Sequence, residues 1–491
     1  NSNEFFLGNV LDNNLPGMNY FFQGGHGAVS GIQLRGLPKR YSTIYIDGVK
    51  MSDPSTSDNS FYFSNIMNSS IDRIEILRGS QSSLYGSSAI GGTINIFTKK
   101  GKKGKNKDIE ISSGSNGTKN INLSFSGANE KHNYFIGLNR FLTDGISAMN
   151  DEPATNDDDS YRNDGIVANY GYKIFENLDF ETGLRFSDSF PNYDRVKETQ
   201  TDINDSTDDT EVSFNAKLTH DIGKFKNTIV FNKTDIDRAT KNYLKNSSSY
   251  FGYRDAINLV GEYKFNLDTK IVYGFDNEFD KAELYNYYTD SRYAESDEAI
   301  YSQYFDLQLR PREDTYTTFG LRRDDHTTTG AYYTGRATVA YKFDNNTKLR
   351  SNLGTSVRFP SLNSLHHGNN LIIKENLKPE KSYSIDFGLE KSLLQNRLNF
   401  GSNIFYMEYD DTISNWESHK ASGSSWTIEN SSGKVKSKGL EFFGSLETSL
   451  IDKITLSYAL TDAHDGEDCD DPDGTCIDEM PVRVPRHSIN T

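Results

Sequence analysis

The chain of 491 residues is poor in cysteine, in proline and in long apolar runs. It contains 2 Cys and 11 Pro, and apolar residues make up 35% of it. Two cysteines cannot build the disulfide framework that stabilises small secreted domains. No segment approaches the roughly 20 consecutive apolar residues that a membrane helix requires. A disulfide scaffold and a helical membrane protein are therefore both excluded.

Basic residues are also in deficit, with 53 Lys and Arg against 69 Asp and Glu, a net charge of −16. A nucleic-acid partner is excluded, because such a protein needs a basic face. In contrast, 29 Tyr and 30 Phe are far more aromatic surface than a solvated, disordered chain carries. The chain begins at Asn1 without Met or an apolar signal segment, so we expect it to be processed or clipped.

The first hundred residues differ from the rest. They are rich in Gly and Ser and contain short apolar runs at 42–48 and 92–97, which predict a small mixed domain. A basic run from Lys99 to Lys107 includes two glycines and resembles a linker, because like charges resist folding. The sequence thus predicts two domains, residues 1–103 and 104–491.

The second region has the period of β-strands. Ile121, Leu123 and Phe125 alternate with polar residues, and each similar apolar face has a polar opposite face. Connections between the predicted strands alternate in length. Short turns alternate with polar loops, predicted at 143–164, 188–210, 235–255, 281–299, 324–333, 356–381, 408–437 and 461–485. This pattern predicts an up-and-down antiparallel meander.

A soluble β-sandwich would also alternate apolar and polar residues. A sandwich has no reason to sort its loops by length, whereas transmembrane barrels have tight turns on one rim and long loops on the other. One lipid-facing stripe per strand explains the low apolar total, and the Tyr and Phe residues can form interfacial girdles. We therefore predict an all-β membrane barrel. About 17 strands are complete, and an eighteenth begins near Arg486, so a lipid-exposed edge would remain at Thr491. We expect the chain to be truncated at its C-terminus.

Several blocks then point to a family. Residues 70–100 read SIDRIEILRGSQSSLYGSSAIGGTINIFTKK, and two further blocks are 34–36 and 44–49. Together they closely resemble the plug domain of TonB-dependent outer-membrane receptors. Barrel blocks at 357–363, 376–384 and 438–441 resemble the same family, and the vitamin B12 (cobalamin) transporters within it are the most similar group.

The resemblance implies a barrel of 22 strands, of which 17–18 are present, with an N-terminal α+β plug in the lumen. It implies the bacterial outer membrane as location, outer-membrane lipid, TonB and a small-molecule ligand as partners, a monomeric state and no enzymatic activity. The family's TonB-contacting box and last strand are missing. We therefore expect an N-terminally truncated plug at 1–103 and a C-terminally truncated barrel at 104–491.

By resemblance, two plug arginines and two barrel carboxylates form a charged lock between plug and wall. They are Arg35, Arg78, Glu380 and Glu441. Guanidinium groups paired with carboxylates fix register in a polar lumen, and removal of one partner leaves an unpaired charge. A solvated lumen charge is the alternative for each. We predict that the four side chains converge.

Two small, polar stretches at turns of the plug are candidates for ligand contact. The residues are Gln23, Gly24, Gly25, His26, Gly27, Ser52, Asp53, Asp58 and Asn59. A nucleotide site is not indicated, because the glycines near Gly86 lack the Lys of a phosphate-binding loop. Tight turns explain these glycines.

Acidic clusters in the predicted loops are candidates for calcium, which takes six to eight oxygen ligands. The cobalamin group binds calcium in loops after its early strands, and the matching candidates are Asp151, Asp157, Asp158, Asp159, Asp202, Asp205, Asp208 and Asp209. A solvated face is the alternative, and for the acidic loop at 461–479 it is preferred. In that loop six residues separate Cys469 from Cys476, which favours a small disulfide over a metal site. The His366–His367 pair alone is a weak metal motif.

No catalytic constellation has a supporting motif, and no catalytic cofactor is expected. Cobalamin is close to neutral, whereas ferric siderophores are mostly anionic and would be repelled by acidic loops. The sequence therefore favours TonB-dependent import of a corrinoid, with a ferric-siderophore receptor as the alternative. A passive porin and a surface adhesin are more distant alternatives.

Overall fold

The computed structural model describes most of the chain. The described residues are 4–147, 158–194, 204–242, 245–287, 290–344, 346–366, 371–373, 376–420, 423–431, 434–448, 452–464, 467–468, 477–478 and 484–490. Within these ranges, no helix is both long and apolar enough to cross a membrane.

The N-terminal domain is a plug built on two small sheets. A mixed sheet has the strand order β4-β3-β6-β5, in which β3 and β6 run parallel and the outer pairs are antiparallel. Its core holds Leu7, Ile32, Ile44 and Ile94. The elements are α1 (Leu7–Asp12), β1 (Met18–Phe22), β2 (Ser30–Leu34), η1 (Lys39–Tyr41), β3 (Ser42–Ile46), β4 (Val49–Met51), η2 (Phe63–Asn65), η3 (Asn68–Ser70), β5 (Ile71–Arg78), α2 (Ser82–Tyr85) and β6 (Gly92–Thr98).

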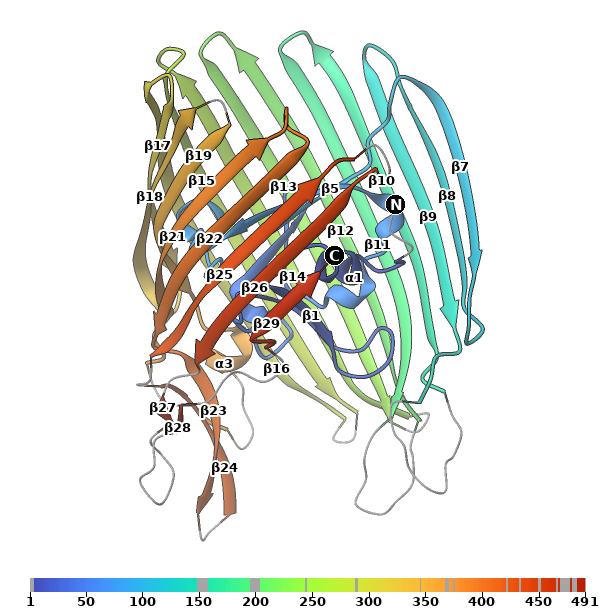
Figure 1. Ribbon diagram of the computed structural model, residues 1–491. Coiled ribbons are helices and arrows are strands. Elements are labelled where there is room, and N and C mark those ends of the chain that lie inside the picture. The colour runs from blue at the N-terminus through green and yellow to red at the C-terminus, as the bar shows by residue number, and fades with distance from the viewer. Residues whose placement is uncertain are drawn as a thin grey trace.

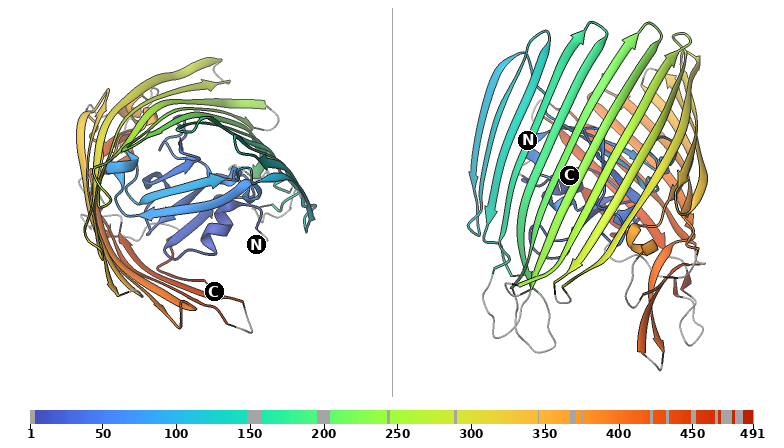
Figure 2. Two further views of the ribbon diagram at one scale, coloured as in Figure 1. Left: turned by 90° about the horizontal axis from the view of Figure 1, so that it is seen from above. Right: turned by 180° about the vertical axis from the view of Figure 1, so that it is seen from behind.

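Within the described ranges, eighteen strands form one antiparallel barrel around the plug (Figures 1 and 2). Each strand pairs with the next one along the wall, so the predicted meander and the predicted 17–18 strands are confirmed. The strands are β7 (Gly104–Ser113), β8 (Lys119–Ala128), β9 (His132–Thr143), β10 (Tyr161–Phe175), β11 (Leu178–Asp194), β12 (Asn204–Ile222), β13 (Phe225–Asn242), β14 (Lys245–Lys264), β15 (Thr269–Asn286), β16 (Ser291–Arg312), β17 (Thr315–His326), β18 (Gly330–Asp344), β19 (Thr347–Arg358), β21 (Glu380–Leu393), β22 (Leu398–Asp410), β25 (Val435–Leu446), β26 (Ile454–His464) and β29 (His487–Asn490).

Smaller helices and strands lie at one rim of the barrel. In the orientation of Figure 1, β23 and β24 project at the lower rim, and the short turns lie at the upper rim. These elements are α3 (Leu362–His366), β20 (Leu371–Ile373), β23 (Ile413–Lys420), β24 (Gly423–Asn430), β27 (Glu467–Asp468) and β28 (Ile477–Asp478). We call this the loop rim and the opposite end the turn rim.

The apolar rows of the strands face outward. In β21 the residues from Glu380 to Gly388 alternate strictly between buried and exposed, and the exposed ones include Tyr383, Ile385 and Phe387. Phe305 and Leu321 are more than half exposed on neighbouring parts of the outer wall. An outward apolar band is what a lipid-spanning barrel requires, and it excludes a sandwich with a dry interior.

Several predicted long loops are instead strand. Residues 235–255 belong mostly to β13 and β14, and 281–299 mostly to β15 and β16. The predicted loop at 324–333 is a turn of three residues, 327–329. Polar composition was misread as loop there, because the strands continue beyond the apolar band and their ladder hydrogen bonds satisfy the backbone without apolar side chains.

Candidate functional site: the boundary between plug and barrel

Arg35 of the plug is buried against two barrel carboxylates. Its Nε and Nη2 donate to Glu441 on β25 at 3.1 and 3.2 Å, and its Nη1 donates to Asp386 on β21 at 2.6 Å. Arg78 shares Glu441 at 3.2 Å and donates to the Pro16 carbonyl at 2.7 Å. We call Arg35, Arg78, Asp386 and Glu441 the Glu441 cluster. Burial lowers the pKa of Arg78, and Glu441 counteracts that effect.

Glu380 lies in a separate cluster. It is fully buried and accepts hydrogen bonds from Arg358 at 2.5 Å, from the Tyr41 hydroxyl at 2.8 Å and from the Ile413 amide at 2.9 Å. Arg40 Nε lies 4.0 Å away. The expectation that Arg35, Arg78, Glu380 and Glu441 meet at one point therefore differs from the structure. Glu380 is the first residue of β21, at the loop-rim end of the strand, three inward positions before Asp386. Arg358 and Arg40 therefore lie near it instead of Arg35 and Arg78.

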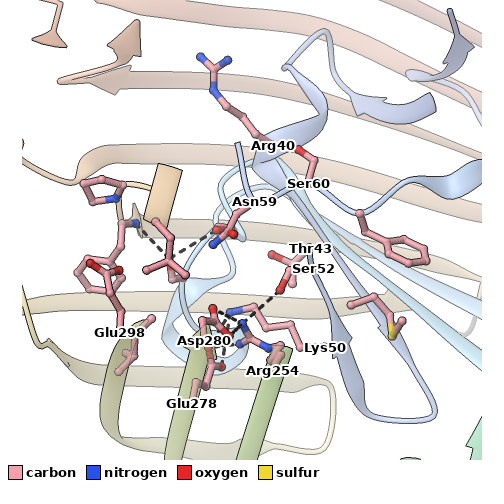
Figure 3. A pocket seen from close by; sticks show the side chains of 18 of the residues that line it. Arg40, Thr43, Lys50, Ser52, Asn59, Ser60, Arg254, Glu278, Asp280 and Glu298 are labelled. Carbon is pink, nitrogen blue, oxygen red and sulfur yellow. Dashed lines mark hydrogen bonds and ion pairs between the residues drawn. The ribbon is translucent and has the colours of Figure 1, made fainter. Parts of the chain in front are cut away.

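A third set of charges lies where the plug meets β14 and β15 (Figure 3). Lys50 Nζ on β4 lies 3.1 Å from Glu278, while Arg254 donates to Glu278 and, at 2.7 Å, to Asp280. Burial lowers the pKa of Lys50, with partial compensation from Glu278. A cavity of ≈50 Å³ adjoins these residues. Within the described ranges, the Thr43 and Ser60 hydroxyls and the Asn59 side-chain carbonyl are buried in its lining without a hydrogen-bond partner.

The second predicted ligand stretch, Ser52–Ser60, is largely occupied by contacts to the plug and wall. Asp53 is buried and accepts from Arg238 on β13 at 2.7 Å, and Ser52 accepts from Arg254 at 3.2 Å. Asp58 pairs with Lys39 at 3.0 Å. Although burial acts to raise it, the Lys39 ammonium brings the pKa of Asp58 down to about 2. Asn59 lines the small cavity.

The first predicted stretch is a more open apex at the loop rim. Gln23 and His26 are exposed, and Gly24, Gly25 and Gly27 are partly buried. The His26 ring stacks on Phe6 with centroids 5.1 Å apart, and desolvation of the packed ring lowers its pKa although part of the side chain is exposed. Gly27 has φ +79°, and a Cβ there would lie 2.3 Å from the Tyr161 ring. The absence of a side chain at Gly27 therefore allows this apex to pack closely against Tyr161, the first residue of β10.

Some of the calcium candidates lie within the described residues and others do not. Asp151, Asp157 and Asp202 lie outside the described residues, as do both cysteines of the predicted disulfide, Cys469 and Cys476. Of the others, Asp209 accepts from the plug's Asn65 at 3.1 Å, and Asp208 lies 3.7 Å from Lys241. The remaining candidates are Asp158, Asp159 and Asp205. Among the described part of the chain, no three His, Cys, Asp or Glu side chains are grouped to hold a metal ion. Calcium binding stays a prediction.

A larger cavity of ≈880 Å³ lies on the turn-rim side of the plug. Arg78 and Glu441 border it, together with Gln81 of the plug and Arg336 of β18. Ile74, Ile76 and Leu77 of β5 give it an apolar side. The Glu441 cluster thus stands at the edge of a cavity, and its charges are buried by protein on the other side.

Sequence reasoning missed several of these partners. Asp386 has the same parity in its strand as Glu380, so the alternation carried a signal for an inward carboxylate. Arg358 stands in one of the quoted family blocks. Lys50, Arg238 and Arg254 carried no signal, because their meeting with the plug depends on how the plug is turned in the barrel.

An eighteen-stranded barrel with a folded domain inside it defines the class of plugged β-barrel membrane proteins. Residues 188–491 match the family model described as TonB dependent receptor-like, beta-barrel, and residues 6–93 match that of the TonB-dependent Receptor Plug Domain. The chain belongs to the TonB-dependent receptor family. It is accordingly a protein of the bacterial outer membrane, from a family of transport receptors that work with TonB and bind small-molecule ligands.

Named relatives include two transporters. The vitamin B12 transporter BtuB of Photobacterium profundum is 26% identical over 457 residues, 92% of this chain and 72% of that protein. BtuB of Vibrio vulnificus (strain CMCP6) is 23% identical over 76% of this chain and 61% of that protein.

Solved structures of siderophore receptors share the fold. The siderophore receptor PirA from Acinetobacter baumannii aligns with a TM-score of 0.78 at 16% identity, covering 99% of this chain and 80% of that one. The ferric enterobactin receptor PfeA in complex with BCV-L6 aligns at 0.77 and 16% identity, with 99% and 81% covered.

Proposed function

We propose that this receptor imports a corrinoid of the cobalamin type across the outer membrane. The observation that carries the proposal is the similarity to a vitamin B12 transporter along 92% of the chain, plug and barrel together. The acidic net charge of −16 agrees with a ligand that is close to neutral.

A ferric siderophore is the second candidate, and one grouping at the boundary of plug and barrel favours it. The Tyr62 ring lies 5.2 Å from Lys39 Nζ and 4.7 Å from the Arg238 guanidinium, an aromatic and cationic grouping suited to an anionic catecholate. Both cations are already neutralised, Lys39 by Asp58 and Arg238 by Asp53. An anion would have to displace these carboxylates, so the corrinoid is preferred.

Equilibrium dialysis of the intact receptor against radiolabelled cyanocobalamin tests the proposal, with ferric enterobactin as the matched competitor. We expect saturable binding of cyanocobalamin that ferric enterobactin does not displace. Repeating the titration in chelator and in Ca²⁺ tests the predicted calcium dependence. Saturable binding of ferric enterobactin without binding of cyanocobalamin would contradict the corrinoid proposal and support a ferric-siderophore receptor.

A further inference from the structure

Buried barrel charges pair with the plug on some sides of the barrel and with other barrel residues on another side. We propose that the plug separates from the barrel along the wall formed by β14–β18, and that the substrate passes along this wall. The inference rests on the proposed function insofar as it concerns the cargo. It follows from the way in which buried charges are paired on the two sides of the plug.

On the side of β21 and β25 the barrel charges depend on the plug. Among the described residues, the cations that pair with Glu441 are Arg35 and Arg78, and the cation that pairs with Asp386 is Arg35. Withdrawal of the plug would leave these two buried carboxylates without cations, which is strongly unfavourable. The Ser80 amide adds a hydrogen bond to the same side of the barrel, donating to the Ser384 hydroxyl at 2.9 Å.

The far edge of the proposed gap is fastened as well. Arg238 on β13 pairs with the plug's Asp53 at 2.7 Å, and Asp209 on β12 accepts from Asn65 at 3.1 Å. Removal of the plug there would take the buried Asp53 carboxylate away from Arg238. The wall from β14 to β18 lies between these two fastened regions.

Three arginines of the β14–β18 wall, Arg254, Arg322 and Arg336, each have a carboxylate partner on the wall itself. The pairs are Arg254–Asp280 at 2.7 Å, Arg322–Asp276 at 2.8 Å, Arg322–Asp324 at 2.7 Å and Arg336–Asp306 at 2.7 Å. Glu278 pairs with the plug's Lys50 but also with Arg254. The plug can therefore leave this wall without stranding a charged wall residue.

The same wall joins the two cavities. Arg254, Glu278 and Glu298 line the small cavity near the loop rim, while Arg336 and Thr338 line the large cavity near the turn rim. Between them stands the short helix α2, in which Ser83 lies against Gly320 of β17. The proposed path requires α2 to move away from β17.

The wall is acidic and so limits the cargo. Around α2 and the small cavity it presents six carboxylates and three guanidinium groups, with the His326 imidazole paired to Glu298. The carboxylates are Asp276, Glu278, Asp280, Glu298, Asp306 and Asp324, and the arginines are Arg254, Arg322 and Arg336. Departure of Lys50 adds to this imbalance. An anion would be repelled along such a wall, whereas a neutral or cationic substrate would not. The buried hydroxyls of Thr43 and Ser60 offer hydrogen bonds to neutral polar groups.

Two cysteine pairs test the proposal in the intact receptor, in a Cys469→Ser, Cys476→Ser background. Ser83→Cys with Gly320→Cys would tie α2 to the β14–β18 wall, because a Cβ on Gly320 lies 3.4 Å from Ser83 Oγ. Ser80→Cys with Ser382→Cys would tie the plug to β21, where the two hydroxyls are 3.3 Å apart.

Binding and uptake of radiolabelled cyanocobalamin are measured in TonB-containing cells before and after reduction. We expect the oxidised Ser83–Gly320 pair to bind cyanocobalamin normally but to lose uptake at least ~10-fold, with recovery on reduction. The Ser80–Ser382 pair should keep uptake within ~2-fold. Undiminished uptake in the first pair, or equal loss in both pairs, would overturn the proposal.

A ligand-independent readout separates this inference from the proposed function. Ser302 on β16 and Ser437 on β25 are matched inward serines, 2% and 0% exposed. In energised cells we expect Ser302→Cys to react with an impermeant maleimide faster than Ser437→Cys, and only when TonB is present. Equal or reversed rates, or no labelling of either, would refute the proposal. Absence of cyanocobalamin binding would instead refute the corrinoid assignment.

Discussion

Arg35 and Glu441 meet across the boundary of plug and barrel although 406 positions separate them in the chain. Two parallel hydrogen bonds, of 3.1 and 3.2 Å, join the guanidinium fork to the carboxylate. Both side chains are buried. This bidentate geometry fixes the rotation of the plug in the barrel, because a fork pairs with a carboxylate in one plane.

Glu441→Ala should loosen the plug. The variant leaves Arg35 and Arg78 without this carboxylate, and we expect a loss of ~3–5 kcal/mol in plug stability if the site is dry and less where Arg78 meets water. Urea-dependent proteolysis of the plug in the intact receptor measures the effect. Glu75→Ala is the matched control, because Glu75 pairs with Arg73 on the exposed face of the plug. Equal changes in both variants would show that the Glu441 cluster does not hold the plug.

Leu321→Arg should impair membrane insertion. Leu321 is 65% exposed in the outward apolar row of β17. An arginine near the midplane of the bilayer costs ~2–4 kcal/mol, and one near the interface only ~0–1 kcal/mol. Thr317→Arg, on the same outward face towards the turn rim, is the control. Folding into lipid vesicles, followed by heat-modifiable gel mobility, should distinguish the two variants. If both fold equally well, this face of β17 does not contact lipid.

Gly27→Ala should distort the loop-rim apex and weaken ligand binding by at least ~10-fold. A Cβ at Gly27 would lie 2.3 Å from the Tyr161 ring, in a backbone with φ +79°. Gly48→Ala provides the control, since Gly48 has φ +86° but no atom within 4 Å of its added Cβ. Both variants carry the conformational cost of a left-handed residue, ~1–2 kcal/mol. Any difference in cyanocobalamin binding between the two variants, measured by dialysis, therefore reports the steric clash at Gly27 and not the backbone cost. Unchanged binding in Gly27→Ala would remove this apex from the ligand site.

The Lys39–Asp58 pair should make the plug acid-sensitive in a defined range. The pKa of Asp58 is about 2 in the folded protein against an ordinary value of 3.8. Between these pH values the unfolded chain binds the proton more readily, so the stabilising contribution is complete above about pH 4 and is lost as the pH falls toward 2.

Lys39→Met removes the cation that contributes most to lowering the pKa of Asp58, and burial is then opposed by the weaker effects of Arg358 and of the Ser60 hydrogen bond. We expect the acid midpoint of plug proteolysis to move upward by roughly 1 pH unit. Lys39→Arg keeps the charge and should retain the parent midpoint. A midpoint that is unchanged in Lys39→Met would contradict the pairing.

The sequence by itself determined the approximate number of strands and the class of the protein, but not how far each strand extends. The period of two in segments such as 121–125 sets one face to lipid and one to the lumen, whatever the neighbouring strand is, so the barrel and its number of strands were predictable. Arg35, Arg78 and Glu441 were also found, through motifs that resemble the family.

Only the tertiary structure decided which charges meet. Asp386 rather than Glu380 completes the cluster of Arg35, because strand register and plug rotation together set which inward carboxylate lies at its height. The pairing of Lys50 with Glu278, and of Asp53 with Arg238, depends on the same rotation. Local patterns specify which way a side chain points, but contacts between distant segments arise only when the plug is seated in the closed wall.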